Sequence, residues 1–295
     1  MVKDKVMSIS DAIALIDEGD HVGFGGVITN RKPMAMIFEL IKQQKKDLVV
    51  SILTGNFGID AMIGMGQIKT LNTIYCGLEN LGFAPNFQQQ VQAGALPVNE
   101  FTEMQFFMAV RASEMGLPFL PTRTGFGSEL IRVNPYLTMM KCPHTEEELV
   151  AVKAIEPDVT IIHSMVGDHQ GNIQLEGSKT YMDDSISRSC KIGGKVIVSV
   201  EKLVDTEYIY RNPINTIINS FEVDVVVEVP FGSHPGSFAP LYASDMATLM
   251  TLANALAKPK RLNRWLEKNI FSLNNWEEYL QKFKLKKDKW WEEKK

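Results

Sequence analysis

The stretch HVGFGGVITNRKPMAMIFELI, residues 21–41, contains a short apolar run, a glycine-rich turn and an apolar helical pattern that begins near Pro33. Six further runs are nearly continuous in β-branched or apolar residues and end at Gly, Asp or Val: DLVVSILTG (47–55), LNTIYCG (71–77), LPFLPTRTG (117–125), DVTIIHSMVGD (158–168), KVIVSVEKLV (195–204) and VDVVVEVPFG (223–232). Strands that are apolar on both faces belong in a parallel sheet covered by helices.

Helical periodicity lies between these runs. The predicted helices are Ser10–Glu18, Met34–Gln44, Glu103–Met115 and Met246–Ala257. The alternation predicts an α/β fold with an open, mostly parallel sheet and helices on both faces. Without a long linker or internal repeat, we expect one domain over residues 1–262, with a C-terminal helix and charged tail, residues 263–295, packed on it. The tryptophans of this last segment indicate either a subunit contact or packing of a terminal helix: Trp265, Trp276, Trp290 and Trp291.

Composition excludes several classes. Of the 295 residues, 45% are apolar and 22% charged, which is typical of globular proteins. The net charge of -4 and the lack of a basic stripe argue against nucleic acid as a partner. Cys76, Cys142 and Cys190 have neither disulfide-framework nor zinc-site spacing, so we expect buried, reduced thiols. No apolar run approaches the roughly 20 residues of a membrane span, and the N-terminus is an amphipathic pattern and not a signal peptide. We therefore expect a cytoplasmic protein with no membrane contact.

Two glycine turns are candidate binding sites. Gly25 and Gly26 lie between a strand and a helix, where backbone amides can approach an anionic ligand, although Ile28 occupies the place of the third glycine in a dinucleotide fingerprint. A tight structural turn explains them equally well. Arg31 could bind a substrate carboxylate or a phosphate, or form a surface ion pair. Gly125 and Gly127 follow the run LPFLPT, which would place both turns beyond the carboxyl ends of parallel strands.

Polar clusters elsewhere favour structural roles. The segment 167–185 holds five possible metal ligands: Asp168, His169, Glu176, Asp183 and Asp184. Their spacing fits no ligand pattern, and GDHQGN is typical of a turn, so we expect no metal site. His163 and His234 end predicted strands and are expected to be hydrogen-bonded structural residues.

The start of the helix at residue 103 carries a carboxylate with two interpretations. Thr102 followed by Gln105 predicts a capping box, with Glu103 as the first helical residue and Glu100 on the surface. A carboxylate there is stabilised by the helix dipole by roughly 0.3–1 kcal/mol. The same position also keeps a carboxylate ionised, as a nucleophile or general base must be.

Taken together, four segments resemble the alpha subunits of family I CoA-transferases, most clearly the glutaconate CoA-transferase type: residues 21–41, 100–128, 150–164 and 223–235. The resemblance implies that the partner is a homologous beta subunit, that the substrates are acyl-CoA and a carboxylic acid, and that no cofactor is permanently bound. It assigns the catalytic glutamate to the beta subunit, in a Ser-Glu-Asn-Gly context that this sequence lacks. It assigns to this chain the loop at Gly25 and Gly26 and the turn formed by Gly125, Phe126 and Gly127.

The resemblance also implies an oxyanion-stabilising glutamine fifteen residues before Pro118, where this sequence has Glu103. An ionised carboxylate cannot donate the hydrogen bond that an amide would. A glutamate at this place resembles the steroid ring-cleaving CoA hydrolases, in which it promotes addition of water to a cyclic keto acyl-CoA. Three functions follow as hypotheses: CoA transfer, ring-opening C–C hydrolysis with Glu103 as the base, and a non-catalytic scaffold.

Overall fold

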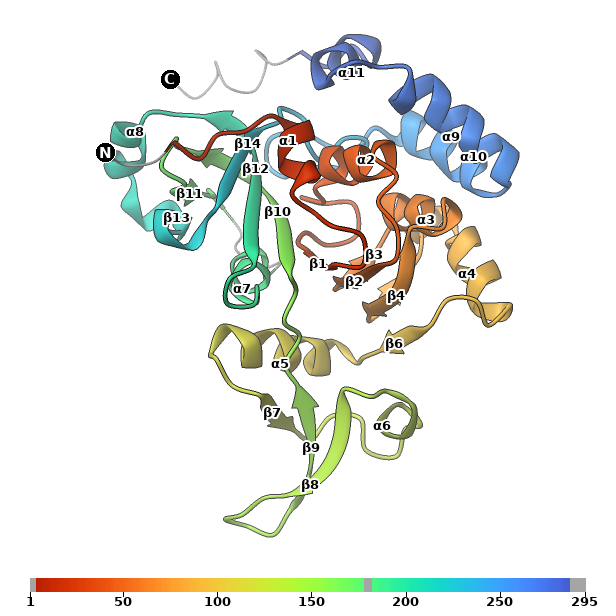
Figure 1. Ribbon diagram of the computed structural model, residues 1–295, viewed down its shortest axis with the longest axis vertical. Coiled ribbons are helices and arrows are strands. Elements are labelled where there is room, and N and C mark those ends of the chain that lie inside the picture. Colours follow the sequence, from red (N-terminus) through yellow and green to blue (C-terminus); the bar gives the residue numbers. More distant parts are fainter. Residues whose placement is uncertain (1–3, 178–181, 287–295) are drawn as a thin grey trace.

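A computed structural model describes residues 4–177 and 182–286 and contains one central sheet with helices on both faces (Figure 1). Seven of the nine strands of this sheet run parallel, in the order β14-β12-β10-β1-β2-β4-β6. These strands are β14 (Val225–Glu228), β12 (Lys195–Leu203), β10 (Val159–Gly167), β1 (His21–Phe24), β2 (Leu48–Ile52), β4 (Ile68–Thr73) and β6 (Val98–Glu100). The short strands β11 (Ile173–Gln174) and β13 (Thr216–Ile218) extend the sheet in antiparallel fashion beside the end of β10. The predicted fold class is confirmed.

Both faces of the sheet are buried, because successive strand residues enter different cores. Ile161 belongs to one apolar cluster and Ile162 to the other, and Ile197 and Val198 divide in the same way. The first cluster is covered by α1 (Ile9–Ala14), α2 (Met34–Lys42), α3 (Phe57–Gly64), α9 (Met246–Leu256) and α10 (Pro259–Leu266). The second cluster is covered by α5 (Glu103–Glu114) and α7 (Asp183–Arg188). This alternation explains the continuous apolar runs of the sequence.

One predicted strand was assigned to the wrong sheet. Residues 119–122 form β7, which pairs with β9 (Glu148–Lys153) and through it with β8 (Leu137–Lys141) in a separate antiparallel sheet. This sheet projects below α5 together with α6 (Leu130–Val133) in Figure 1. Its first strand is partly solvated, with Phe119 39% exposed. Pro118 and Pro121 lack the N–H groups that a central strand needs, which fits an edge strand.

The C-terminal segment packs on the first helical layer. It consists of α10, a π-helical turn at Glu267–Phe271 and α11 (Trp276–Lys282). Trp265 packs against Phe38 at 6.0 Å between ring centroids, and Trp276 stacks on Tyr279 at 4.1 Å. These two tryptophans make contacts within the chain, and their role in a subunit contact stays a prediction. Trp290 and Trp291 lie outside the described residues.

The remaining short elements connect these layers. They are β3 (Thr54–Gly55), which pairs with β5 (Tyr75–Cys76), α4 (Pro85–Gln92), α8 (Thr206–Arg211) and 3-10 turns at Glu79–Leu81, Pro213–Asn215 and Ser220–Glu222. The three cysteines are free; Cys76 is buried as predicted, but Cys142 and Cys190 are only partly buried. Within the described ranges, every helix is too short or too polar to cross a membrane.

Candidate active site

The central sheet changes direction between β1 and β10. From β1 the chain builds β2, β4 and β6 on one side, and after β10 it builds β12 and β14 on the other. Phe24, the last residue of β1, pairs with Ile52 of β2 and Ile161 of β10. Ligands of open α/β sheets bind beyond the carboxyl ends of the strands at such a switch point. Gly25 and Gly26 follow Phe24 directly and therefore begin at this place.

The backbone amides of the first glycine turn are directed into the protein. Four consecutive amides donate within the chain: Gly25 to Ile161 O (3.0 Å), Gly26 to Asp183 Oδ1 (2.7 Å), Val27 to Asn30 O (3.0 Å) and Ile28 to Thr54 Oγ1 (2.6 Å). In this chain alone, the amides of Gly25 and Gly26 are therefore hydrogen-bonded within the protein and do not point at a ligand as expected. Close packing requires both glycines, because a Cβ would lie 2.6 Å from Asp183 Oδ1 at Gly25 and 2.5 Å from Arg31 O at Gly26.

Three buried charges lie behind this turn. The Arg31 guanidinium is 3.1 Å from Asp183 Oδ2, and both side chains are almost fully buried. The surface ion pair expected for Arg31 is therefore wrong, and its binding to a substrate carboxylate or phosphate stays a prediction. Lys32 Nζ donates to Gly26 O at 2.6 Å and to Gly25 O at 3.3 Å. Burial lowers the pKa of Lys32 to about 7. Burial also raises the pKa of Asp183, although the charge of Arg31 and the hydrogen bond from the Gly26 N–H partly offset this increase.

The second glycine turn is fastened to the start of α5. Gln105 Nε2 donates to Thr124 O at 3.1 Å, and a Cβ at Gly125 would lie 2.3 Å from that nitrogen. Gly125 and Gly127 both have positive φ, 96° and 74°, and Phe126 between them is 45% exposed. The prediction that this turn lies beyond the carboxyl end of a parallel strand is wrong, because β7 is not in the central sheet. The turn nevertheless lies beside the candidate carboxylate at the start of α5.

The capping box at the start of α5 is confirmed. Thr102 Oγ1 accepts from Gln105 N at 3.2 Å, and Gln105 Oε1 accepts from Thr102 N at 2.9 Å. Glu103 is the first residue of the helix, and its side chain is exposed, as is that of Glu100. Gln105 is fully buried and its amide is committed to Thr102 and Thr124. It cannot supply the amide that the resemblance places at residue 103.

Strand register relates Glu103 to the first glycine turn. Ser51 pairs with Asn72, and Thr73 pairs with Glu100. The carboxyl ends of β1, β2, β4 and β6 are thus level with one another. Glu103, three residues beyond Glu100, and Gly25 lie past the same edge of the sheet, separated by the width of β2 and β4.

The polar segment after β10 is a turn, as predicted. Asp168 accepts hydrogen bonds from the backbone N–H groups of Gln170 (3.0 Å) and Asn172 (2.8 Å), and from Asn172 Nδ2 (2.8 Å). Throughout the described ranges, His, Cys, Asp and Glu side chains form no group of three that could hold a metal.

The two candidate histidines are structural. His163 lies within β10, not at its end, and contacts Ser199 Oγ at 2.9 Å and Glu201 Oε1 at 2.7 Å. His234 Nδ1 contacts Tyr279 Oη at 2.8 Å. Both rings are buried.

Sequence reasoning missed the buried Glu201. Its Oε2 accepts from Phe231 N at 2.6 Å, and its Oε1 accepts from Tyr242 Oη at 2.5 Å. The segment 231–242 is thereby fixed to β12, and it holds the first glycine turn, since Arg31 N donates to Ser237 O at 2.9 Å. The signal in the sequence was a single carboxylate in the mostly apolar run KVIVSVEKLV.

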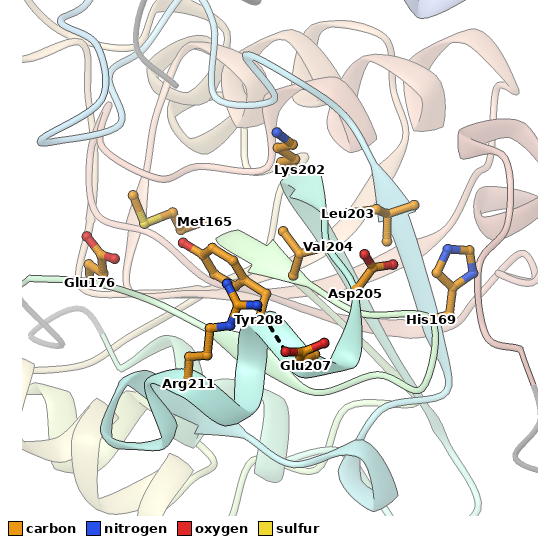
Figure 2. Close-up of a pocket in the computed structure, with 10 residues that line it drawn as sticks. All are labelled: Met165, His169, Glu176, Lys202, Leu203, Val204, Asp205, Glu207, Tyr208 and Arg211. Carbon is orange, nitrogen blue, oxygen red and sulfur yellow. Dashed lines mark hydrogen bonds and ion pairs between the residues drawn. The ribbon is translucent and has the colours of Figure 1, made fainter. Parts of the chain in front are cut away.

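Two cavities lie near the strand ends. The first cavity, of about 540 Å³, lies at the carboxyl ends of β10 and β12. It is lined by acidic and basic side chains, among them Arg211 and Glu207, which form an ion pair of 3.0 Å (Figure 2). None of the predicted site residues lines it. The other, of about 350 Å³, is lined by residues 27–30 of the first glycine turn. None of the predicted site residues lines the second cavity either, but its residues 27–30 connect Gly26 to Arg31 in the chain. The second cavity is therefore the better candidate for a substrate.

Known proteins are similar to this chain in sequence and fold. Residues 6–229 match the family model described as Coenzyme A transferase. The A subunit of glutaconate CoA-transferase from Acidaminococcus fermentans is 30% identical, over 94% of this chain and 91% of its own length. The cholesterol ring-cleaving hydrolase IpdA subunit from Rhodococcus jostii is 32% identical, over 79% of this chain and 80% of its own length.

Structural comparison agrees with the sequence matches. The crystal structure of the Acidaminococcus glutaconate CoA-transferase superposes with a TM-score of 0.88, over 96% of this chain and 94% of the matched chain at 29% identity. This chain spans 62% of the length of a 30% identical Archaeoglobus fulgidus relative. By its family match and its similarity to these relatives, the chain belongs to the coenzyme A transferase family.

Proposed function

We propose that this chain is the alpha subunit of a two-subunit CoA-transferase that moves CoA between carboxylic acids. The observation that carries the proposal is that the carboxyl ends of β1, β2, β4 and β6 form one edge of the sheet, with the first glycine turn at one end of this edge and the start of α5 at the other. The chain is also similar to the A subunit of glutaconate CoA-transferase along 94% of its length. CoA is carried as a thioester on a glutamate of the partner subunit. No cofactor needs to be resident, because the acyl-CoA brings the reactive thioester.

In this account Glu103 positions the substrate. Its carboxylate lies in the first turn of α5, at the positive end of the helix dipole, and is exposed. There it can accept hydrogen bonds from a substrate or a water molecule but cannot donate one while ionised.

Apolar exposure beside Glu103 supports a partner subunit over this site. Met104 is 42% exposed and Phe126 is 45% exposed. Large apolar side chains at a surface are typical of protein contacts. The partner would then cover Glu103 and bring its own glutamate to the same edge of the sheet. A cytoplasmic location stays a prediction.

A second candidate function is ring-opening C–C hydrolysis of a CoA thioester. The observation that favours it is the sequestered amide of Gln105, which leaves the exposed carboxylate of Glu103 as the group available at the start of α5. A general base at this place would take a proton from water as the water attacks a ring carbonyl. The similarity to the IpdA subunit is consistent with this reaction.

Replacing Glu103 by Gln in the assembled two-subunit enzyme separates the candidates. We expect CoA transfer to increase, because the amide restores the donor that transferases of this type are expected to use. Loss of roughly 10²-fold or more in turnover of a cyclic keto acyl-CoA would instead identify Glu103 as a base and contradict transfer.

Glu100→Gln is the matched control. It removes another exposed carboxylate three residues earlier, at the end of β6. If Glu103→Gln and Glu100→Gln both leave every activity of the complex unchanged, the scaffold hypothesis is favoured.

A further inference from the structure

The cavity of about 350 Å³ beside the first glycine turn has three walls from distant parts of the chain. Val27 and Ile28 of the turn form one wall, Leu78 and Glu79 form the second, and Met246 and Leu249 of α9 form the third. Phe57, at the start of α3, closes the inner end and is 2% exposed. A cavity of this size is within the range of small-molecule sites.

Two walls of the cavity hold backbone strain. Ile28 has φ of 53° and Glu79 has φ of 55°. The left-handed region is rare for residues other than glycine and is a true outlier for a β-branched residue such as Ile28. Such strain persists where the surroundings impose it, and it concentrates at ligand sites. Here the Ile28 N–H is held by Thr54 Oγ1 at 2.6 Å, and Glu79 O accepts from Gly82 N at 3.0 Å.

The third wall is fixed by the cap of α9. Asp245 accepts hydrogen bonds from Thr248 N at 3.0 Å and Thr248 Oγ1 at 2.6 Å. Asp245 also contacts the buried His234 at 3.3 Å. Met246 follows this cap directly and is 50% exposed at the mouth of the cavity. The cavity is therefore bounded by fixed backbone, with a flexible side chain at its entrance.

The lining favours an uncharged ligand. The buried side chains of Phe57, Leu78 and Leu249 give it an apolar part. The polar residues of the lining other than Glu79 are uncharged: Thr29, Asn30, Asn80 and Ser244. Among the described residues that line the cavity, Glu79 is the only charged one, and it is acidic. A carboxylate placed there would lose water, meet no cation and face a like charge, all of which oppose binding.

We propose that this cavity binds the apolar end of the acyl group of the CoA thioester and selects against acyl groups that end in a carboxylate. The inference rests on the proposed function, which places acyl-CoA at the neighbouring turn. The inference distinguishes this chain from glutaconate CoA-transferase, because glutaconate is a dicarboxylic acid and its second carboxylate would be disfavoured in this cavity. The substrate class is accordingly a monocarboxylic acyl-CoA with a hydrocarbon chain or ring.

Inert thioethers test the inference by binding alone. The assembled two-subunit enzyme is titrated calorimetrically with S-hexyl-CoA, S-(5-carboxypentyl)-CoA and S-methyl-CoA, which lack the thioester carbonyl and cannot react. We expect S-hexyl-CoA to bind at least tenfold more tightly than S-(5-carboxypentyl)-CoA. Glu79→Lys should reverse this order, because it replaces the like charge with a cation.

Met246→Trp and Met250→Trp form a matched pair on α9. Both methionines are about equally exposed, at 50% and 52%, but only Met246 lines the cavity. Met246→Trp should fill the mouth of the cavity, weaken the binding of S-hexyl-CoA at least tenfold and change the affinity for S-methyl-CoA by less than threefold. Met250→Trp should change neither affinity.

Two results would overturn the inference: equal or tighter binding of the carboxylated thioether by the unaltered enzyme, or the same loss from Met250→Trp as from Met246→Trp. Because no turnover is needed, these titrations decide the inference even if the complex proves inactive as a transferase. Turnover of hexanoyl-CoA tests the proposed function separately.

Discussion

At the scale of single residues, the first glycine turn is defined by buried charge. Asp183 accepts the Gly26 N–H at 2.7 Å and pairs with Arg31 at 3.1 Å, and Lys32 donates to the carbonyl of Gly26 at 2.6 Å. Gly25 must be glycine because Asp183 occupies the place of a Cβ. The turn is therefore shaped from behind by these charges and not by a ligand in front of it.

Replacing Asp183 by Asn should destabilise the fold strongly. The variant keeps an acceptor for Gly26 but removes the carboxylate charge that lies 3.1 Å from the buried Arg31 guanidinium. Breaking a buried ion pair in this way costs about 3–5 kcal/mol. Asp184→Asn is the neighbouring control, because Asp184 is 39% exposed and pairs with Arg188 at 3.2 Å. Exposed pairs contribute at most about 1 kcal/mol. Urea unfolding of both variants measures the difference, and equal losses would contradict a structural role for the Asp183 charge.

The candidate residues were predictable to different degrees. The place of Glu103 followed from the local pattern Thr-Glu-Met-Gln, because a capping box is encoded within four residues. The inward direction of the turn amides could not be predicted. It depends on Asp183, which is separated from Gly26 by 157 residues.

At the scale of elements, the start of α5 connects the sheet edge to the second glycine turn. Gln105 closes the capping box and also donates to Thr124 O at 3.1 Å. The turn at residues 124–127 thereby receives its position from a buried side chain of the helix. Movement of Gln105 would displace both Glu103 and the turn.

Gln105→Ala should therefore cost more stability than Thr102→Ala. Loss of an N-cap hydroxyl costs about 1 kcal/mol, whereas Gln105→Ala removes two buried hydrogen bonds of about 1 kcal/mol each and leaves a void. Ser8→Ala, at the N-cap of α1, is the control for an ordinary cap. Hydrogen exchange at residues 124–127 should rise most in Gln105→Ala, less in Thr102→Ala, whose Oγ1 contacts Thr124 Oγ1 only at 3.5 Å, and not at all in Ser8→Ala. Equal exchange there in all three variants would exclude the proposed coupling.

The longer elements with clear apolar patterns were predictable because those patterns are local, whereas short elements such as α3, α4, β8 and β9 were missed. The four predicted helices match α1, α2, α5 and α9 to within a few residues. β6 was missed because three residues, Val98–Glu100, with a polar end carry no apolar run. The strand at 119–122 was recognised but placed in the wrong sheet, because its partners, β9 and β8, were themselves not recognised.

At the scale of the whole molecule, the candidate groups lie along one edge of the sheet. The cavity at residues 27–30 lies at the β1 end and Glu103 at the β6 end of the same level row of strands. Met104 and Phe126, next to Glu103, leave apolar surface exposed. This distribution favours an active site completed by a second subunit, in which this chain provides positioning groups and the acyl cavity.

Trapping the covalent intermediate decides whether CoA transfer uses a nucleophile on the partner subunit. The purified pair is incubated with acyl-CoA, and each subunit is measured by intact mass before and after borohydride reduction. We expect a CoA adduct on the partner subunit, lost on reduction together with transferase activity, and none on this chain. A CoA adduct on this chain, or turnover with no adduct on either subunit, would contradict that expectation.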